Sequence, residues 1–258
     1  MIVEGGKAVY GAQVGILLLE ARFPRLPGDV GHAATWPFPV LYRVVPGATP
    51  ERVVRHRAEG LLEAFVAAGR ELVAAGADGI VTNCGFLVLQ QQALQAALSV
   101  PVATSSLLQV PLVQALLPPG RRVGILTISA EDLSADHLRA AGVPVDAPVV
   151  GCPPEGEFAR AILGDRPTMD IEAAEHDLLV AADRLVRCYP EVAAIVLECT
   201  NMCPFAAAIA RQVARPVFDM VSLVCWFRQG LAPRRHFHRE DLAVCSTNRS
   251  LFPDPGFP

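Results

Sequence analysis

The sequence predicts an α/β fold of two pseudo-symmetric lobes, each a parallel sheet flanked by helices, with the active site in the cleft between them. The first observation is an internal repeat, because the string VGIL stands at 14–17 and again at 123–126. The second is a longer match. One offset of 115 residues superimposes Ile80 on Ile195, Cys84 on Cys199 and Pro101 on Pro216. Self-similarity at a fixed offset is the sequence signature of repeated structural units.

Apolar runs and helical segments alternate along the chain, which is the third observation. Short apolar runs typical of buried parallel strands occupy 14–19, 78–82, 100–103, 123–128, 192–197 and 215–218. Segments rich in alanine and leucine, with helical spacing, occupy 51–75, 86–98, 106–117, 131–141, 170–188 and 205–213. Strands that alternate with helices in this way predict a parallel α/β sheet.

The repeat divides the chain into a first lobe at 1–118, a second lobe at 119–227 and an irregular tail at 228–258. The proline-containing stretch 116–124 is the best linker between the lobes. For the tail, packing against the first lobe and an oligomer contact both stay open. The segment 20–50 is rich in proline and lies outside the periodic pattern. Loops of that length are usually functional or disordered, and its four aromatic residues favour an ordered loop near the cleft.

Composition narrows the class of protein. The chain has 258 residues, 52% hydrophobic and 19% charged, which is ample material for a core. Its net charge of −4 without a long basic run argues against nucleic acid or a membrane surface as a partner. The apolar run at 14–19 is too short to span a bilayer, and no signal peptide is recognisable. Seven cysteines without a C-x-x-C pair indicate free thiols, so we expect a cytoplasmic protein.

Two cysteines at equivalent strand ends suit proton transfer at a carbon next to a carboxylate. Inverting such a centre requires a base on one face and an acid on the other, which Cys84 and Cys199 would supply as one thiolate and one thiol. Each stands where a helix is about to begin, and a helix N-terminus lowers the pKa of a thiol. The unpaired helix N–H groups would also bind the carboxylate and stabilise the developing enolate.

Neighbouring polar residues are the candidates for substrate binding. Amides and hydroxyls bind carboxylate oxygens without adding charge, and glycine lets the backbone approach a ligand closely. The predicted substrate-binding residues are Asn83, Gly85, Phe86, Ser105, Thr127, Thr200 and Asn201. No metal site and no cofactor are expected, since neither a metal-ligand spacing nor a phosphate-binding glycine motif is present.

The paired motifs TNCGF and ECTNM, together with VGILT opening the second half, resemble the aspartate/glutamate/hydantoin racemase superfamily. The resemblance runs from Val14 to about Phe227. It implies two pseudo-symmetric α/β lobes, no cofactor, and one catalytic cysteine from each lobe, here Cys84 and Cys199. It further implies a racemase or epimerase acting on an amino acid or a related small carboxylic or hydantoin-like compound, with a homo-oligomer left open.

Departures from that resemblance keep other reactions open. The first-lobe motif and the asparagine at 201 differ from those of glutamate racemases, which puts glutamate in doubt as the substrate. A maleate-type cis–trans isomerase and an arylmalonate-type decarboxylase on the same scaffold are the alternatives, and a non-catalytic carboxylate binder is a third hypothesis. The apolar Phe86 favours a less polar substrate side chain, although it also fits a core residue.

Several residues allow an ordinary structural interpretation. Free cysteine often packs as a small hydrophobe, which fits Cys203. A zinc set of Cys199, Cys203, His236 and His238 matches no usual spacing. Glu198 points either into the site or to solvent, since alternation at a strand end allows both. Asp29 fits a rim residue or a turn residue equally.

Overall fold

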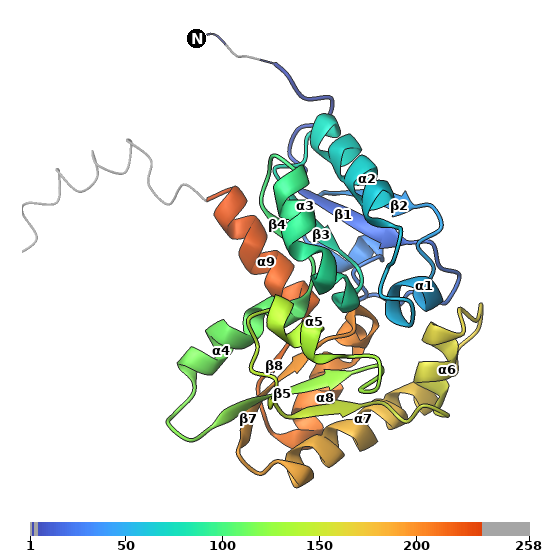
Figure 1. The fold of residues 1–258 in the computed structure, drawn as a ribbon, viewed down its shortest axis with the longest axis vertical. Helices are drawn as coiled ribbons and strands as arrows, with labels where there is room; N and C mark the ends of the chain where they lie inside the picture. Colours follow the sequence, from blue (N-terminus) through green and yellow to red (C-terminus); the bar gives the residue numbers. More distant parts are fainter. Residues whose placement is uncertain (1, 3–4, 234–258) are drawn as a thin grey trace, which may run out of the picture.

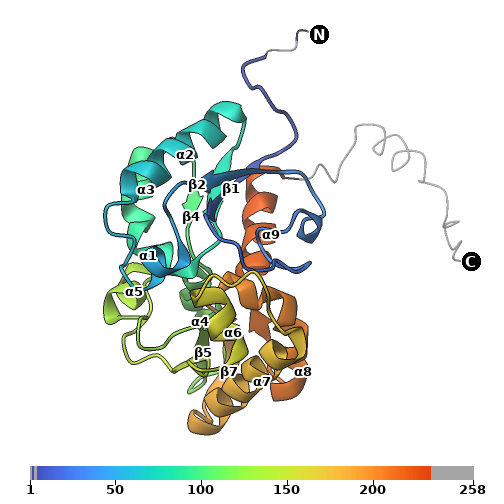
Figure 2. The same ribbon diagram turned by 90° about the vertical axis from the view of Figure 1, so that its right-hand side faces the viewer.

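The structure, a computed structural model, describes residue 2 and residues 5–233. It contains two parallel four-stranded sheets, ordered β2-β1-β3-β4 and β6-β5-β7-β8. The strands are β1 Val14–Leu19, β2 Val40–Val45, β3 Gly79–Thr82, β4 Val102–Ala103, β5 Arg122–Thr127, β6 Val149–Gly151, β7 Val192–Leu197 and β8 Val217–Phe218. The two orders are identical once the repeat is applied, so the predicted pair of pseudo-symmetric lobes is confirmed, and Figures 1 and 2 show one lobe above the other.

Helices cover the two sheets. The α-helices are α1 Pro50–Val54, α2 Leu62–Ala75, α3 Gln91–Ala97, α4 Val110–Leu116, α5 Ala135–Ala140, α6 Glu157–Leu163, α7 Ile171–Cys188, α8 Ala206–Val213 and α9 Met220–Leu231. Four 3-10 helices accompany them: η1 Ala33–Thr35, η2 Gly85–Gln90, η3 Ser106–Gln109 and η4 Thr200–Phe205. In both lobes a 3-10 helix follows the second central strand directly, η2 after β3 and η4 after β7, so the repeat extends to the turns that carry the cysteines.

The two central strands of each sheet are buried runs of apolar residues. β1 pairs with β3 on one side and β2 on the other, and all four residues of β3 are buried. In the second lobe β5 pairs with β7 and β6 in the same way. Side chains on both faces of these strands are removed from water, which is why the sequence shows continuous apolar runs there instead of alternation.

Two edge strands were missed by the sequence prediction. β2 lies inside the segment 20–50, which was expected to be a loop, and most of its side chains are half-buried or exposed. β6 has only three residues. Edge strands with one exposed side carry a weak hydrophobic pattern, so composition alone did not distinguish them from loops.

One helix of each lobe packs on the other lobe. α9 lies on the sheet of the first lobe, where Met220 and Val224 share a cluster with Val14 and Ile16. A side chain on Gly79 of β3 would collide with α9. α4 reaches the second lobe, where its Gln114 accepts a hydrogen bond from the β5 backbone at 3.0 Å, and Figure 1 shows both exchanges.

Because of these exchanges, each of the two expected lobe segments includes a helix that packs on the other lobe. The first-lobe segment 1–118 contains α4, which packs on the second lobe, and the second-lobe segment 119–227 contains most of α9, which packs on the first. The tail expected from residue 228 starts later, because α9 continues to Leu231. The remainder of that tail, 234–258, lies outside the described residues.

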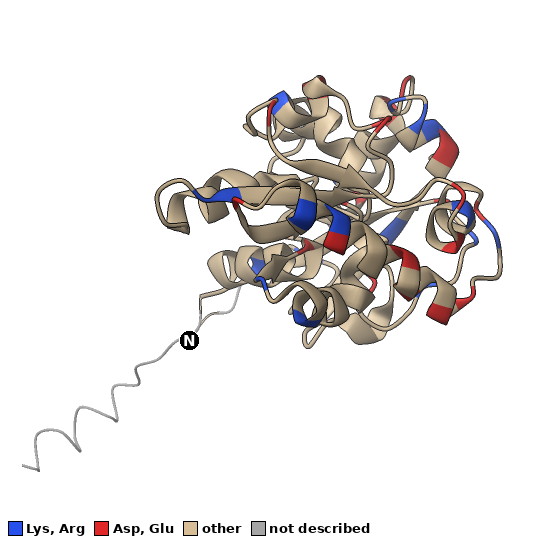
Figure 3. Cartoon of the chain, turned by 90° about the horizontal axis from the view of Figure 1, so that it is seen from below, with Lys and Arg blue, Asp and Glu red and all other residues tan. Residues whose placement is uncertain are grey.

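Charged residues of both signs are interspersed over the surface seen in Figure 3. Several of them form exposed ion pairs, such as Arg57 with Asp136 at 2.9 Å and Arg43 with Glu71 at 2.6 Å. Exposed pairs of this kind contribute little to stability. Within the described part of the chain, no helix combines the length and the apolar character needed to cross a bilayer.

Candidate active site

Both cysteines of the repeat stand at the start of a 3-10 helix, immediately beyond a buried strand. Cys84 is the residue before η2, with an extended backbone at φ −149° and ψ 121°. Cys199 occupies the same place before η4, at φ −78° and ψ 124°. Because β3 and β7 are parallel strands in equivalent positions, both thiols lie at the carboxyl ends of their sheets, where ligands bind in open α/β folds.

Cys84 and Cys199 line one small cavity of about 20 Å³ between the lobes. Its wall is mostly apolar and combines the two cysteine motifs with residues of the 20–50 segment, α1 and α6. The lining residues are Leu19, Phe23, Pro50, Val54, Asn83, Cys84, Gly85, Phe86, Ile128, Ile162, Leu163, Glu198, Cys199, Thr200 and Asn201. The volume is close to that of one water molecule, so substrate entry requires part of this wall to move.

Five of the predicted substrate-binding residues lie on this wall, and two do not. The five are Asn83, Gly85, Phe86, Thr200 and Asn201. Ser105 is buried behind the wall and its hydroxyl accepts a hydrogen bond from the Leu107 backbone at the start of η3. Thr127 is also buried and donates its hydroxyl to Glu198 at 2.8 Å. Ser105 and Thr127 are thus not on the cavity wall, and each hydroxyl already has a hydrogen-bond partner.

Polar groups at the two strand ends also form buried hydrogen bonds, two of which join the lobes. The hydroxyl of Thr200 donates to the backbone oxygen of Asn83 at 2.6 Å, and Asn83 Oδ1 accepts from the Leu19 backbone at 2.8 Å. Nearby, the hydroxyl of Ser106 donates to the backbone oxygen of Leu197 at 2.6 Å. These buried bonds fix the relative position of the two strand ends that carry the thiols.

Asn201 connects Cys199 to the 20–50 segment. Its Oδ1 accepts from the Cys199 thiol over 3.6 Å, and its Nδ2 donates to Asp29 Oδ2 over 2.5 Å. Asp29 is buried and pairs in turn with Arg25 at 2.9 Å. Asp29 is therefore part of the site, and the proline-rich segment serves as a wall. The sequence contained no periodic signal that would have linked Asp29 to a motif 172 residues away.

Glu198 is the buried acid of the site. Its side chain is fully buried, Oε2 accepts the hydrogen bond from Thr127, and Oε1 has no partner among the described residues. Burial raises the pKa of Glu198 to about 8, and the hydrogen bond from Thr127 opposes that rise. The sequence did not decide whether the Glu198 side chain points into the site or to solvent. In the structure it points inward, toward Gly85.

The pKa of both thiols is raised, which corrects the expectation that the helix N-termini would lower it. Burial, followed by the charge of Glu198, raises the pKa of Cys84 to about 12. The same two causes raise the pKa of Cys199 well above its ordinary value. The backbone N–H groups of Phe86 and Asn201 act in the opposite direction on the two sulfurs. Removal from water outweighs those donors, because a closed apolar cavity disfavours the thiolate.

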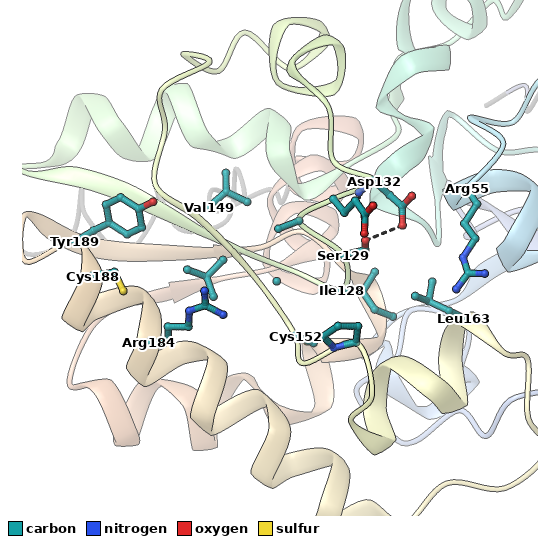
Figure 4. Close-up of a pocket in the computed structure, with 15 residues that line it drawn as sticks. Arg55, Ile128, Ser129, Asp132, Val149, Cys152, Leu163, Arg184, Cys188 and Tyr189 are labelled. Carbon is teal, nitrogen blue, oxygen red and sulfur yellow. Dashed lines mark hydrogen bonds between the residues drawn. The ribbon is translucent and has the colours of Figure 1, made fainter.

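A larger cavity of about 610 Å³ adjoins the thiol cavity, with Ile128 and Leu163 on the walls of both. Figure 4 shows it at the ends of β5 and β6, with Arg55 and Arg184 on opposite sides and Cys152 near Ile128. Ile128 and Leu163 therefore lie on the boundary that the thiol cavity shares with a space big enough for a substrate.

Within the described residues, no group of three or more His, Cys, Asp or Glu side chains is arranged to hold a metal ion. The two histidines of the zinc alternative, His236 and His238, lie outside the described residues, as does Cys245. Cys203 is buried and packs with Trp36 and Met220 in the cluster beneath α9.

Comparison with solved structures identifies the architecture. A glycine-to-cysteine variant of arylmalonate decarboxylase superimposes with a TM-score of 0.56 at 19% identity, covering 85% of this chain and 92% of that one. Allantoin racemase from Pseudomonas fluorescens gives 0.54 at 16% identity, over 84% and 90% of the two chains. Glutamate racemase from Bacillus anthracis gives 0.53 at 15% identity, over 85% and 82%.

The chain has the same two-lobed α/β fold as these three enzymes. No family model matches the sequence.

The sequence relatives of the chain have names that differ from those of its structural neighbours. A dimethylsulfoniopropionate lyase of Durusdinium sp. clade D is 27% identical over 241 residues, covering 89% of this chain and 78% of the relative. Dimethylsulfoniopropionate lyase 7 of Emiliania huxleyi is 28% identical over 220 residues, covering 81% of this chain and 64% of the relative. The chain thus spans less than two thirds of the second relative.

Proposed function

We propose that the protein removes the proton next to the carboxylate of a small acid and that the electron pair left on carbon expels a group from the β-carbon. The observation that carries this proposal is that Cys84 and Cys199 line one small cavity between the lobes. A thiolate within about 3 Å of the α-hydrogen serves as the base. Hydrogen-bond donors around the cavity stabilise the negative charge that develops on the carboxylate.

The relatives support dimethylsulfoniopropionate or a close analogue as the substrate class. This zwitterion has a carboxylate, an α-methylene group and a sulfonium on the β-carbon. Transfer of the α-proton to the thiolate forms the carbon–carbon double bond, and the carbon–sulfur bond breaks with its electron pair going to sulfur. The products are acrylate, dimethyl sulfide and a protonated base. The apolar wall suits the methyl groups and keeps water from the carbanion.

Cys84 is the better base of the two thiols. Burial raises the pKa of both thiols, to about 12 for Cys84, but Cys84 is only half-buried whereas Cys199 is buried. The N–H of Phe86 faces its sulfur and favours the thiolate. Cys199, bonded to Asn201, is the group that stays protonated.

Headspace gas chromatography of dimethyl sulfide tests the proposal directly. The wild-type protein and the Cys188→Ser control, which changes an exposed thiol, are expected to release dimethyl sulfide from dimethylsulfoniopropionate. The Cys84→Ser variant is expected to be slower by about 10²- to 10⁴-fold, the usual loss for a positioned base. An inactive wild type, or a Cys84→Ser variant as fast as the control, contradicts the elimination.

Racemisation is the second candidate, favoured by the origin of the two thiols in repeat-related lobes. A racemase removes the α-proton on one face and returns a proton on the other, so it needs both Cys84 and Cys199. Racemisation is detected by incubating single enantiomers of amino acids and hydantoins in deuterium oxide and measuring deuterium uptake by mass spectrometry. Maleate and arylmalonates are included in the panel to test the isomerase and decarboxylase alternatives. The Cys199→Ser variant separates the reactions, because it is expected to lose racemisation while retaining part of the elimination.

A further inference from the structure

A cleft of about 600 Å³ between the lobes, here called the interlobe cleft, is lined by charged residues. Its wall combines α1 of the first lobe with α6 and the residues around it in the second. The arginines on this wall are Arg22, Arg55, Arg160 and Arg166, and the acids are Glu51, Glu155 and Asp165. Arg22 pairs with Asp165 at 3.2 Å and Arg166 with Glu157 at 3.9 Å, so among the described residues Arg55 and Arg160 have no acidic partner.

The interlobe cleft meets the thiol cavity at two residues, one from each lobe. Pro50 of α1 and Leu163 at the end of α6 line both spaces. Leu163 is only half-buried. Arg55 directly follows Val54, a residue of the thiol cavity wall, and its side chain extends toward Leu163 in Figure 4. A guanidinium group therefore lies where the interlobe cleft reaches the thiol cavity, whose own described lining contains no Lys or Arg.

The end of α6 is held in place by bonds near the surface. Asp165, two residues after Leu163, accepts hydrogen bonds from the backbone of Arg22 at 2.5 Å and of Phe23 at 3.2 Å. The side chain of Arg22, which pairs with the same acid, is 79% exposed. The strand ends are joined instead by buried bonds such as that of Thr200. Segments held by solvent-exposed bonds open more easily than buried ones, so the end of α6 is the part of the wall that moves for entry.

We propose that the interlobe cleft is where the substrate first binds and that Leu163 is the gate through which it reaches the thiols, a proposal that rests on the proposed function. Arg55 binds the substrate carboxylate, because a guanidinium group donates two parallel hydrogen bonds to the two carboxylate oxygens. Glu51 and Glu155 supply negative charge on the same wall. The interlobe cleft therefore suits a small zwitterion that carries a carboxylate and a separate cation.

Two alkylating agents of similar size test the role of Arg55 without substrate. Iodoacetate carries a carboxylate, iodoacetamide is neutral, and peptide mass spectrometry gives the rate of each at Cys84. In Arg55→Gln the iodoacetate-to-iodoacetamide rate ratio is expected to fall by about 2- to 5-fold, the effect of an exposed ion pair, and Arg55→Lys is expected to restore part of it. Arg211→Gln, at an exposed position of α8, is the control. Equal ratios in Arg55→Gln and this control overturn the role of Arg55.

The gate is tested by changing the size of Leu163. Leu163→Ala is expected to raise the alkylation rate of Cys84 several-fold with both reagents, and the larger side chain of Leu163→Phe is expected to lower it. Leu112→Ala, at an exposed leucine of α4, is the control. Cys203 is buried in the cluster beneath α9, so its alkylation reports opening of the whole fold and is expected to stay unchanged. Equal Cys84 rates in Leu163→Ala and the control, or a parallel rise at Cys203, overturn the gate.

Two matched ligands test the preference for a zwitterion. β-Alanine betaine and isocaproate share the carboxylate and the chain length, but only the betaine carries a cation. The betaine is expected to protect Cys84 from iodoacetamide at lower concentration, and equal protection by the two ligands overturns this preference.

Kinetics with dimethylsulfoniopropionate connect the entrance to turnover. Arg55→Gln is expected to raise KM by about 2- to 5-fold with kcat unchanged, as for the loss of an ion pair that forms before the chemical step. A wild type that releases no dimethyl sulfide contradicts the proposed function. The alkylation ratios of Arg55→Gln then support or overturn the entrance independently, because they require no turnover.

Discussion

Asn201 donates a hydrogen bond from Nδ2 to Asp29 Oδ2 over 2.5 Å, which leaves its Oδ1 as the atom that accepts from the Cys199 thiol. An amide free to rotate would present either end to the sulfur, and only the oxygen accepts the thiol proton. Asp29 is itself held by Arg25 and by the Gly31 backbone. The 20–50 segment therefore controls the orientation of a group in contact with the second thiol.

Asp29→Asn is expected to slow turnover by roughly 10-fold, in line with the loss of an orienting partner of a site residue. The substitution removes the carboxylate that selects one orientation of the Asn201 amide, and it leaves Arg25 without its partner. Steady-state kinetics on the reaction found for the wild type check this. Glu63→Gln, at an exposed acid of α2, is the control; equal effects of the two changes would show that the Asn201 orientation is unimportant.

Gly85→Ala is expected to destabilise the protein by about 1 to 3 kcal/mol, the usual range for overpacking, and to abolish activity. The new methyl group would overlap Glu198 Oε1 and its backbone oxygen. Thermal unfolding and activity measurements check both effects. Gly230→Ala is the control, because nothing lies within 4 Å of its position on α9. A Gly85→Ala protein as stable and as active as the control contradicts the close packing of the lobes at this point.

Removal of the inter-lobe hydroxyls is expected to loosen the cavity. Ser106→Ala and Thr200→Val each break a buried hydrogen bond of 2.6 Å that joins the two lobes. Each change is expected to lower the free energy of unfolding by about 1 to 2 kcal/mol. Urea titration measures the loss, with Ser129→Ala as a comparison, because the Ser129 hydroxyl bonds Asp132 within the second lobe. Additive losses in the double variant would indicate that the two bonds act independently.

Stability is expected to depend on pH through Glu198. Its pKa is raised to about 8 in the folded protein from an ordinary value of 4.5, so the folded state retains a proton that the unfolded state has released. The contribution of the neutral acid to the free energy of unfolding is complete below pH 4.5 and is lost as the pH rises to 8. Glu198→Gln is therefore expected to gain melting temperature relative to wild type at pH 8 but not at pH 4.5. An unchanged difference across that interval refutes this assignment.

His137 gives a pH dependence of the opposite sign. The buried ring lies edge-on to Phe86 at 5.2 Å, and burial lowers the pKa of His137 to about 4. Below pH 6.5 the unfolded state binds a proton at His137 that the folded state does not bind until the pH approaches 4. The contribution of the neutral ring to the free energy of unfolding is therefore complete above pH 6.5. It falls as the pH drops toward 4, by at most about 1.4 kcal/mol per pH unit. His137→Gln should flatten this acid limb in urea titrations, whereas the exposed His56→Gln should not.

Most of the architecture was predictable from the sequence, because it depends on patterns that repeat along the chain. The buried strands β1, β3, β5 and β7 appeared as apolar runs, and the offset that aligns Cys84 with Cys199 also aligns their strands. The edge strands β2 and β6 were missed because one side of an edge strand is exposed and the pattern weakens.

The electrostatics of the site were not predictable in the same way. Motif position indicated a low thiol pKa, but burial reverses that direction, and burial depends on how Phe23 and Ile162 close the cavity. The role of Glu198 likewise depended on which way one side chain turned at a strand end. The available signal was a charged residue, Glu198, between a long apolar run and a cysteine. Gly85, 113 positions earlier, has no side chain and so leaves the space that the Glu198 side chain occupies.

The exchange of α4 and α9 between the lobes has a consequence for how the chain folds. A protein cut at residue 118 would lack α9. The apolar side chains of Val14, Ile16 and Val81 would then be exposed to water, and we expect the N-terminal half to aggregate. Neither half is thus a self-sufficient folding unit. The two halves share one strand order, yet each has a helix of the other packed on its core, so we expect them to fold cooperatively.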